Sequence, residues 1–122
     1  MKPERVVIIG ASSNPERYSH RALLLLRKHG HEVVPVHPAL TEIEGVPVVA
    51  DLGLVSGPVD TVTMYVGPAI SSGLLDKLLA LKPGRVIFNP GAENAPLAAA
   101  LQKAGITCEE ACTLVLLNTG QF

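Results

Sequence analysis

Aromatic residues are scarce in this sequence: they make up 3% of its 122 residues, and tryptophan is absent. Proteins that grip single-stranded nucleic acid stack its bases on aromatic side chains. The net charge of −1 at pH 7 also gives no excess of basic residues for phosphate backbones or anionic membranes. We therefore expect a core of aliphatic side chains and no nucleic-acid partner.

Cysteines and long apolar runs are also few. The two cysteines do not form a disulfide framework, and their spacing with the histidines does not match a zinc site. The longest uninterrupted aliphatic stretch, residues 22–26, is far shorter than the ~18 residues that indicate a membrane span. Residues 1–5 lead straight into an apolar segment without a signal-peptide pattern. We expect a protein of the reducing cytoplasm with no metal site and no membrane partner.

Aliphatic residues are abundant by contrast. Hydrophobic residues account for 48% of the chain and charged residues for 17%, against a typical charged share of ~25%. The 11 glycines and 10 prolines are together about a sixth of the chain, below the ~25–30% of low-complexity sequences. These values, with no linker or repeat, predict one globular domain over residues 1–122 that buries a core without disulfides.

Short apolar runs alternate with helical patterns along the chain. The β-branched run over residues 6–9, stopped by Gly10, is typical of a strand buried on both faces. Similar runs predict strands over residues 32–36, 46–49, 60–66, 85–88 and 106–109. Helices are predicted over residues 18–29, 51–55, 71–81, 95–104 and 113–118. This alternation predicts an α/β fold, a Rossmann-like doubly wound parallel sheet of about five strands in three α/β/α layers.

Serine, glycine and proline refine the element boundaries. Ser19 is the expected N-cap of the first helix, and Gly30 is the expected stop after it. Ser71 or Ser72 is the expected cap of the helix over residues 71–81. Pro35 has no N–H to donate, which predicts an edge strand or a local irregularity.

The carboxyl ends of the predicted strands carry the candidate site, because ligands bind there in doubly wound sheets. The segments at these ends are residues 10–13, 37–38, 66–68 and 89–91, and three of the four contain a proline just past the strand. Prolines that merely terminate strands are one interpretation. The other is a rigid, mostly apolar rim with exposed backbone polar groups, which suits a flat heterocycle on a sugar-phosphate chain.

The segment Gly10–Arg17 is the best candidate for holding phosphate. Its small residues let backbone N–H groups approach an anion, the following helix N-terminus favours negative charge, and Arg17 can pair with phosphate. The segment is neither GxGxxG nor a Walker loop. His37 stands at the end of the second strand, where an NAD site has an acid for the ribose. The pattern favours a nucleotide-like ligand other than NAD.

Two segments carry a family resemblance: Gly10-Ala11-Ser12-Ser13-Asn14-Pro15-Glu16-Arg17 and Gly30-His31-Glu32-Val33-Val34-Pro35-Val36-His37-Pro38. They resemble the small single-domain CoA-binding proteins, which are similar to the N-terminal domain of the succinyl-CoA synthetase alpha subunit. Residues 45–48, 60–62, 89–94 and 105–106, with Cys112, fall where that family has its own signatures. The resemblance covers essentially the whole chain and implies a Rossmann-like fold that binds CoA or a related adenine nucleotide.

By position, the resemblance places residues 12–15 on the phosphate loop and residues 89–91 on a further segment that touches CoA. The synthetase has a lysine shortly after the second strand, where this chain has Leu40, so the resemblance does not supply a 3′-phosphate contact. The synthetase's catalytic histidine lies on another domain that is absent here. The implied function is therefore binding of CoA or an acyl-CoA without catalysis.

The residues predicted to bind this cofactor are Gly10, Ala11, Ser12, Ser13, Asn14, Pro15, Arg17, Tyr18, Ser19, His37, Pro38, Val66, Gly67, Pro68, Asn89, Pro90 and Gly91. No catalytic set of nucleophile, base and orienting group stands at the strand ends. Two alternatives stay open. One is an NAD(P)-binding Rossmann domain, and the other is an interaction or regulatory module for an acyl-CoA enzyme, with a protein partner or a second copy of the chain.

Three further side chains, those of Cys112, His20 and Tyr18, each allow two interpretations. Cys112 is either a reactive thiol before a helix or a packed residue, and Cys108 is expected in the core. His20 either contacts phosphate or is an exposed residue of the first helical turn. Tyr18 either covers the ligand or packs on the rim.

Overall fold

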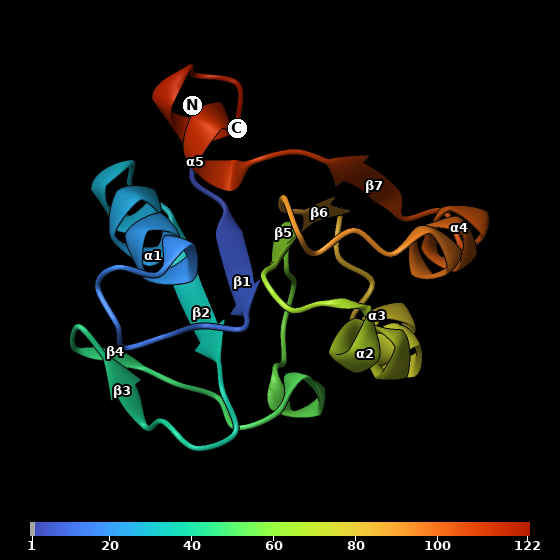
Figure 1. Ribbon diagram of the computed structural model, residues 1–122, viewed down its shortest axis with the longest axis horizontal. Coiled ribbons are helices and arrows are strands. Elements are labelled where there is room, and N and C mark those ends of the chain that lie inside the picture. The colour runs from blue at the N-terminus through green and yellow to red at the C-terminus, as the bar shows by residue number, and fades with distance from the viewer. Residues whose placement is uncertain (1) are drawn as a thin grey trace.

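Five short strands form the central sheet of the structure, a computed structural model that describes residues 2–122. All neighbouring strands run parallel, in the order β2-β1-β5-β6-β7 (Figure 1). The strands are β1 Arg5–Ile9, β2 Glu32–Val36, β5 Thr61–Met64, β6 Arg85–Phe88 and β7 Thr107–Glu110. Val6, Val7 and Ile8 of β1 are fully buried, as a strand with helices over both faces requires.

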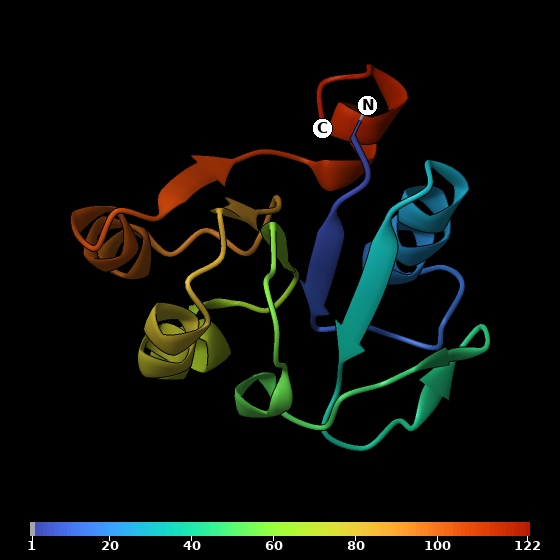
Figure 2. The same ribbon diagram turned by 180° about the vertical axis from the view of Figure 1, so that it is seen from behind.

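Helices cover both faces of this sheet, so the predicted three-layer Rossmann-like fold is confirmed (Figures 1 and 2). On one face, α1 Tyr18–Lys28 and α5 Thr113–Asn118 pack on the even-numbered residues of β1. On the other face, α3 Leu75–Leu81 and α4 Ala95–Lys103 pack on the odd-numbered ones. No helix among the described residues is long and apolar enough to cross a membrane.

The order of the strands reverses between β1 and β5. From β1 the chain passes through α1 to the edge strand β2, then returns across the sheet to β5 on the other side of β1. The next crossover, through α2 and α3, leads from β5 in the opposite direction to β6. Because the crossovers that leave β1 and β5 diverge, a crevice opens beyond the carboxyl ends of these two strands. Pro35 lies on the edge strand β2, as predicted.

The predicted strand over residues 46–49 is wrong in extent and place. Val46–Pro47 (β4) pairs antiparallel with Glu42–Ile43 (β3) in a small hairpin outside the main sheet, and Val49 forms only an isolated bridge with Val36. The hairpin forms because Glu44 and Gly45 both adopt positive φ angles, 51° and 77°, which suit a tight two-residue turn.

The predicted caps are also corrected. Arg17, without a side-chain bond, is the N-cap of α1, and Ser19 is buried inside that helix. The helix expected over residues 71–81 starts earlier, as α2 Pro68–Ser71, a 3₁₀ turn Ser72–Leu74 and α3, because Pro68 is well suited to a first helical position. Ser71 and Ser72 cap nothing with their side chains. Their hydroxyls accept from Asn94, which is the N-cap of α4.

Residues 51–55 form only a 3₁₀ turn, Leu52–Leu54, whose N-cap Asp51 accepts from Gly53 N. Gly30, at φ 87°, follows the C-terminus of α1 as predicted. The other predicted helices and strands agree with the structure to within about two residues at each end, the usual uncertainty of such boundaries.

Gly10 is the glycine that lets the chain turn away from the sheet directly after β1. Its φ is 85°, and a Cβ atom there would lie 2.8 Å from Val66 Cγ1 and 3.2 Å from the Tyr65 carbonyl group. Gly10→Ala should therefore lower the free energy of unfolding by about 2 kcal/mol or more, through left-handed strain and this contact. Denaturant unfolding measures the change.

The matched control is Gly67→Ala, because Gly67 has an ordinary φ of −78° and a Cβ atom there would meet no other group within 4 Å. Equal stability of the two variants would contradict the role given to Gly10.

Candidate nucleotide-binding site

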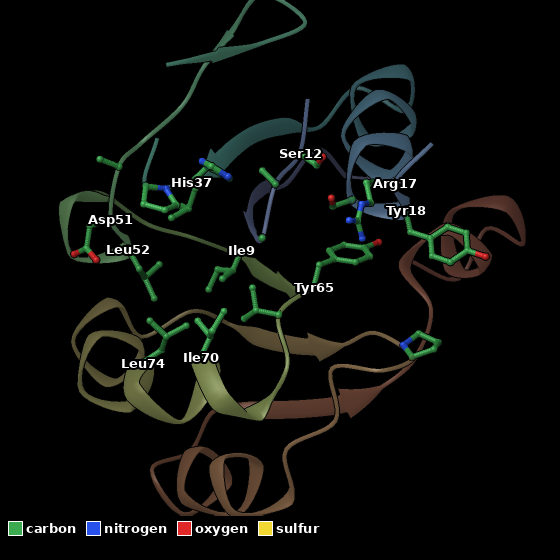
Figure 3. A pocket seen from close by; sticks show the side chains of 18 residues that line it. Ile9, Ser12, Arg17, Tyr18, His37, Asp51, Leu52, Tyr65, Ile70 and Leu74 are labelled. Atoms are coloured by element: carbon green, nitrogen blue, oxygen red, sulfur yellow. The ribbon is translucent and has the colours of Figure 1, made fainter. Parts of the chain in front are cut away.

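A cavity of about 670 Å³ opens at the carboxyl ends of β1, β2 and β5 (Figure 3). It lies at the point where the order of the strands reverses, the usual ligand position in such sheets. Its lining consists of Ile9, Gly10, Ala11, Ser12, Arg17, Tyr18, Ser19, Val36, His37, Pro38, Ala50, Asp51, Leu52, Tyr65, Val66, Ile70, Leu74 and Pro90.

The β1–α1 loop forms one side of the cavity and presents free backbone donors. Among the described residues, the N–H groups of Ala11, Ser12 and Ser13 have no hydrogen-bond partner. The first-turn N–H groups of Tyr18 and Ser19 are also open, since the α1 N-cap offers no side chain and the first turn holds no acid. This side of the cavity therefore favours an anion.

The loop holds its shape through its own side chains. Asn14 N donates to Ser12 Oγ and Glu16 N to Asn14 Oδ1, each at 3.0 Å, and Arg17 N donates to the Asn14 carbonyl. Residues 13–15 are exposed beyond the cavity lining. The Asn14 side chain thus folds the loop. Direct contact between residues 13–15 and a ligand stays a prediction.

His37 is the polar side chain at the β2 side of the cavity (Figure 3). Its Nδ1 accepts hydrogen bonds from Ala39 N at 3.0 Å and Leu40 N at 3.1 Å. In the neutral ring the proton is then on Nε2. His37 therefore offers an N–H donor at the position where NAD-binding sheets carry an acid.

The wall of the cavity that faces the β1–α1 loop is aliphatic. Leu52 and Ile9 are buried beneath it, and Leu74 and Ile70 project from the α2 region (Figure 3). The one acid of the lining, Asp51, bonds Lys77 Nζ at 2.7 Å and Gly53 N at 2.9 Å. The hydrogen bond from Lys77 has the larger effect and the one from Gly53 N the smaller, and together they hold the pKa of the Asp51 carboxyl below its ordinary value. Because both carboxylate oxygens have partners, this wall is suited to a flat apolar ring.

Tyr65 forms the floor between the loop and this wall. Burial raises the pKa of its hydroxyl to about 12, although the nearby hydroxyls of Thr113 and Thr63 lower this pKa in part. The buried hydroxyl oxygen forms no hydrogen bond of ordinary geometry with the described residues. Tyr65 therefore stays protonated and contributes its ring to the cavity.

Asn89 does not reach the cavity with its side chain. The buried amide donates to Thr63 Oγ1 at 2.7 Å and to the Met64 carbonyl at 2.9 Å, and it accepts from Thr113 N at 2.9 Å. It therefore ties β5, β6 and the start of α5 together. Sequence position alone could not distinguish this scaffold role from ligand contact.

The structure brings most of the predicted residues together. Those that line the cavity are Gly10, Ala11, Ser12, Arg17, Tyr18, Ser19, His37, Pro38, Val66 and Pro90. Those outside the lining are Ser13, Asn14, Pro15, Gly67, Pro68, Asn89 and Gly91. Tyr18 is 66% exposed at the mouth, with the Arg21 guanidinium 5.6 Å from its ring centre. Binding of a ligand by these residues stays a prediction.

Sequence reasoning missed eight lining residues: Ile9, Val36, Ala50, Asp51, Leu52, Tyr65, Ile70 and Leu74. Strand ends could have indicated Ile9, Val36 and Tyr65, since each adjoins a predicted rim segment. Residues 50–52 carry no local signal, because the return path from β2 brings them to the cavity.

The two cysteines lie outside the lining. Cys112 is the N-cap of α5. Cys108 is partly buried and packs against the core, and this burial raises the pKa of its thiol.

Asn89→Ala should lower the free energy of unfolding by about 2–3 kcal/mol, because it leaves the buried Thr113 N–H without its acceptor and removes the amide donor to Thr63 Oγ1 and the Met64 carbonyl. Thermal or urea unfolding measures this loss. Asn118→Ala, exposed at the end of α5, is the matched control. If Asn89→Ala is as stable as this control, the scaffold role is wrong.

Comparison with known proteins supplies the family. The model of the CoA binding domain matches residues 4–118. A crystal structure of an uncharacterized protein is 38% identical, with a TM-score of 0.94 and coverage of 100% of both chains. Uncharacterized protein YneT of Bacillus subtilis (strain 168) is 33% identical over 64 residues, which are 52% of this chain and 47% of that protein. That match thus spans about half of the curated relative.

A more distant likeness concerns a large enzyme. The dinucleotide forming acetyl-coenzyme A synthetase 1 of Ca. Korarchaeum cryptofilum aligns with 87% of this chain at a TM-score of 0.74 and 20% identity, over 25% of its own length. At this identity the likeness shows the shared fold alone. The family match over residues 4–118 confirms the resemblance seen in the sequence, and the chain belongs to the CoA binding domain family.

Proposed function

We propose that this chain binds CoA or an acyl-CoA in the cavity at the carboxyl ends of β1, β2 and β5. The observation that carries the proposal is the division of the cavity into an anion-favouring loop and an aliphatic wall. CoA has the same division, since a pyrophosphate joins its adenosine to the pantetheine arm. Membership of the CoA binding domain family supports this choice of ligand.

The pyrophosphate lies against the β1–α1 loop in this proposal. The free N–H groups of residues 11–13 and of the first turn of α1 donate to its oxygens. Arg17 adds charge, because its exposed guanidinium forms no ion pair or hydrogen bond with any described residue. Figure 3 shows the Arg17 side chain beside Ser12 and above Tyr65.

The adenosine lies at the other end of the cavity. Leu52, Ile70 and Leu74 offer apolar contacts to the flat base, and His37 Nε2–H offers a donor to the sugar or its phosphate. A cavity of about 670 Å³ is within the ~300–1,000 Å³ range of ligand pockets. The pantetheine arm then leads out past Tyr18 and Pro90 at the rim.

We propose binding without catalysis. His37 is the one histidine in the lining, and its Nδ1 is already used by two backbone donors. Cys112, the nucleophile singled out in the sequence, is outside the lining. Among the described residues, the cavity therefore offers no side-chain nucleophile with a base and an orienting group beside it.

Isothermal titration should show CoA binding at micromolar affinity or tighter, and NAD binding more weakly, because no acid stands at the end of β2 for the NAD ribose. Arg17→Ala should weaken CoA binding by about 1.5–3 kcal/mol, roughly ten- to hundredfold in Kd, with little change in stability.

Lys28→Ala is the matched control, since it removes the same charge from the far end of α1. NAD binding tighter than CoA would replace the proposal with a nicotinamide-nucleotide function. Equal CoA affinity of wild type and Arg17→Ala would remove Arg17 from the site.

A further inference from the structure

His20 occupies a buried position in the first turn of α1, and both its ring nitrogens are bonded. Nδ1 lies 2.8 Å from the Ser12 carbonyl oxygen, and Nε2 lies 2.9 Å from Glu44 Oε2. The side chain is 2% exposed, so the interpretation of His20 as an exposed residue is wrong. His20 is also outside the cavity lining, so it does not face a ligand directly.

Both partners of the ring are acceptors. The Ser12 carbonyl oxygen can only accept, so Nδ1 is the donor in that hydrogen bond. Nε2 faces the Glu44 carboxylate at 2.9 Å, and this contact fixes the plane of the buried ring from its other side. Glu44 is the charged side chain in contact with the ring, and its own carbonyl accepts from Arg27 Nη1 at 3.1 Å.

The bond to Ser12 decides which way the loop's peptide groups face. Ser12 lines the cavity, and its carbonyl oxygen would repel phosphate if it turned inward. His20 draws this oxygen toward the protein interior instead. Because a trans peptide is planar, the Ser13 N–H of the same peptide group must point the opposite way. That N–H has no partner among the described residues and remains available to an anion.

Glu44 connects this arrangement to the β3–β4 hairpin. Glu44 sits in the hairpin turn at φ 51°, and Ile43 beside it is 2% exposed in the core cluster that includes Leu23 and Leu26 of α1. Arg27 binds the main chain of the same turn. The hairpin is thus fixed to α1 at three points, and through His20 it supports the loop over residues 10–17.

We infer that His20 is a positioning residue for anion binding: backed by Glu44 of the hairpin, it turns the Ser12 carbonyl away from the cavity and the Ser13 N–H toward the ligand. The inference rests on the proposed function, since CoA is the anion to be bound. It assigns the hairpin, which contributes no residue to the cavity lining, an indirect role in affinity.

The test compares His20→Leu, which removes both ring nitrogens, with His20→Asn, whose amide N–H reaches the position of Nδ1. Titration calorimetry with CoA and NMR titration with adenosine are carried out on each variant. His20→Leu should bind CoA about tenfold or more weakly, the loss of at least one charge-assisted contact, whereas His20→Asn should stay within about threefold of wild type. Adenosine, which has no phosphate, should bind all three proteins equally.

The matched control is His29→Leu at the exposed C-terminus of the same helix, which should leave CoA affinity unchanged. If His20→Leu does not fold, Glu44→Ala takes its place, because the Glu44 side chain is 45% exposed and its removal opens no core. Glu44→Ala should bind CoA several-fold more weakly than wild type and adenosine as well as wild type.

Wild-type CoA affinity in His20→Leu, or in Glu44→Ala where it is the substitute, would overturn the positioning role. So would equal losses in His20→Asn and His20→Leu, or a matching loss for adenosine, because these results indicate a packing role alone. A wild-type protein that binds neither CoA nor inorganic pyrophosphate would overturn the proposed function, and the positioning role with it.

Discussion

The placement of β1 between β2 and β5 is the constraint on which the site depends. The chain goes from β1 through α1 to β2 on one side and from β5 through α2 and α3 to β6 on the other, so these two crossovers diverge and leave a crevice between the ends of β1 and β5. Gly10 then turns the chain at a φ of 85°, where a Cβ atom would lie 2.8 Å from Val66 Cγ1 and 3.2 Å from the Tyr65 carbonyl group. This turn after β1 sets the positions of the loop and of the start of α1 relative to the floor of the cavity.

The cavity combines two environments, one rich in hydrogen-bond donors and one aliphatic. Along the loop lie open N–H groups and the Arg17 guanidinium, which has no partner among residues 2–122, whereas most proteins satisfy such donors internally. Across the floor, Asp51 has both oxygens bonded and the leucines offer only apolar surface. A ligand with phosphates at its centre and a flat base at one end satisfies both. Family membership and geometry therefore lead to the same class of ligand.

The sequence predicted the sheet because most of its strands are short runs rich in β-branched residues, and one such run, residues 6–9, is buried throughout and ends at Gly10. Reading the strand ends also located the rim. Two features depended on tertiary packing. His20 is buried because the hairpin turn at Glu44 covers it, and Leu52 reaches the cavity because the chain returns from β2 across the sheet. Neither position carries a local pattern that distinguishes it from a surface turn.

An ¹H–¹⁵N NMR titration of the wild-type protein with CoA shows whether CoA occupies the cavity at the reversal of strand order. If it does, the largest shifts are expected for the amides of residues 11–13 and 17–19, with further shifts near His37 and Leu52. Little change is expected along β7 at the far edge of the sheet. Shifts that cluster at the amino ends of the strands, or along β7, would contradict this placement.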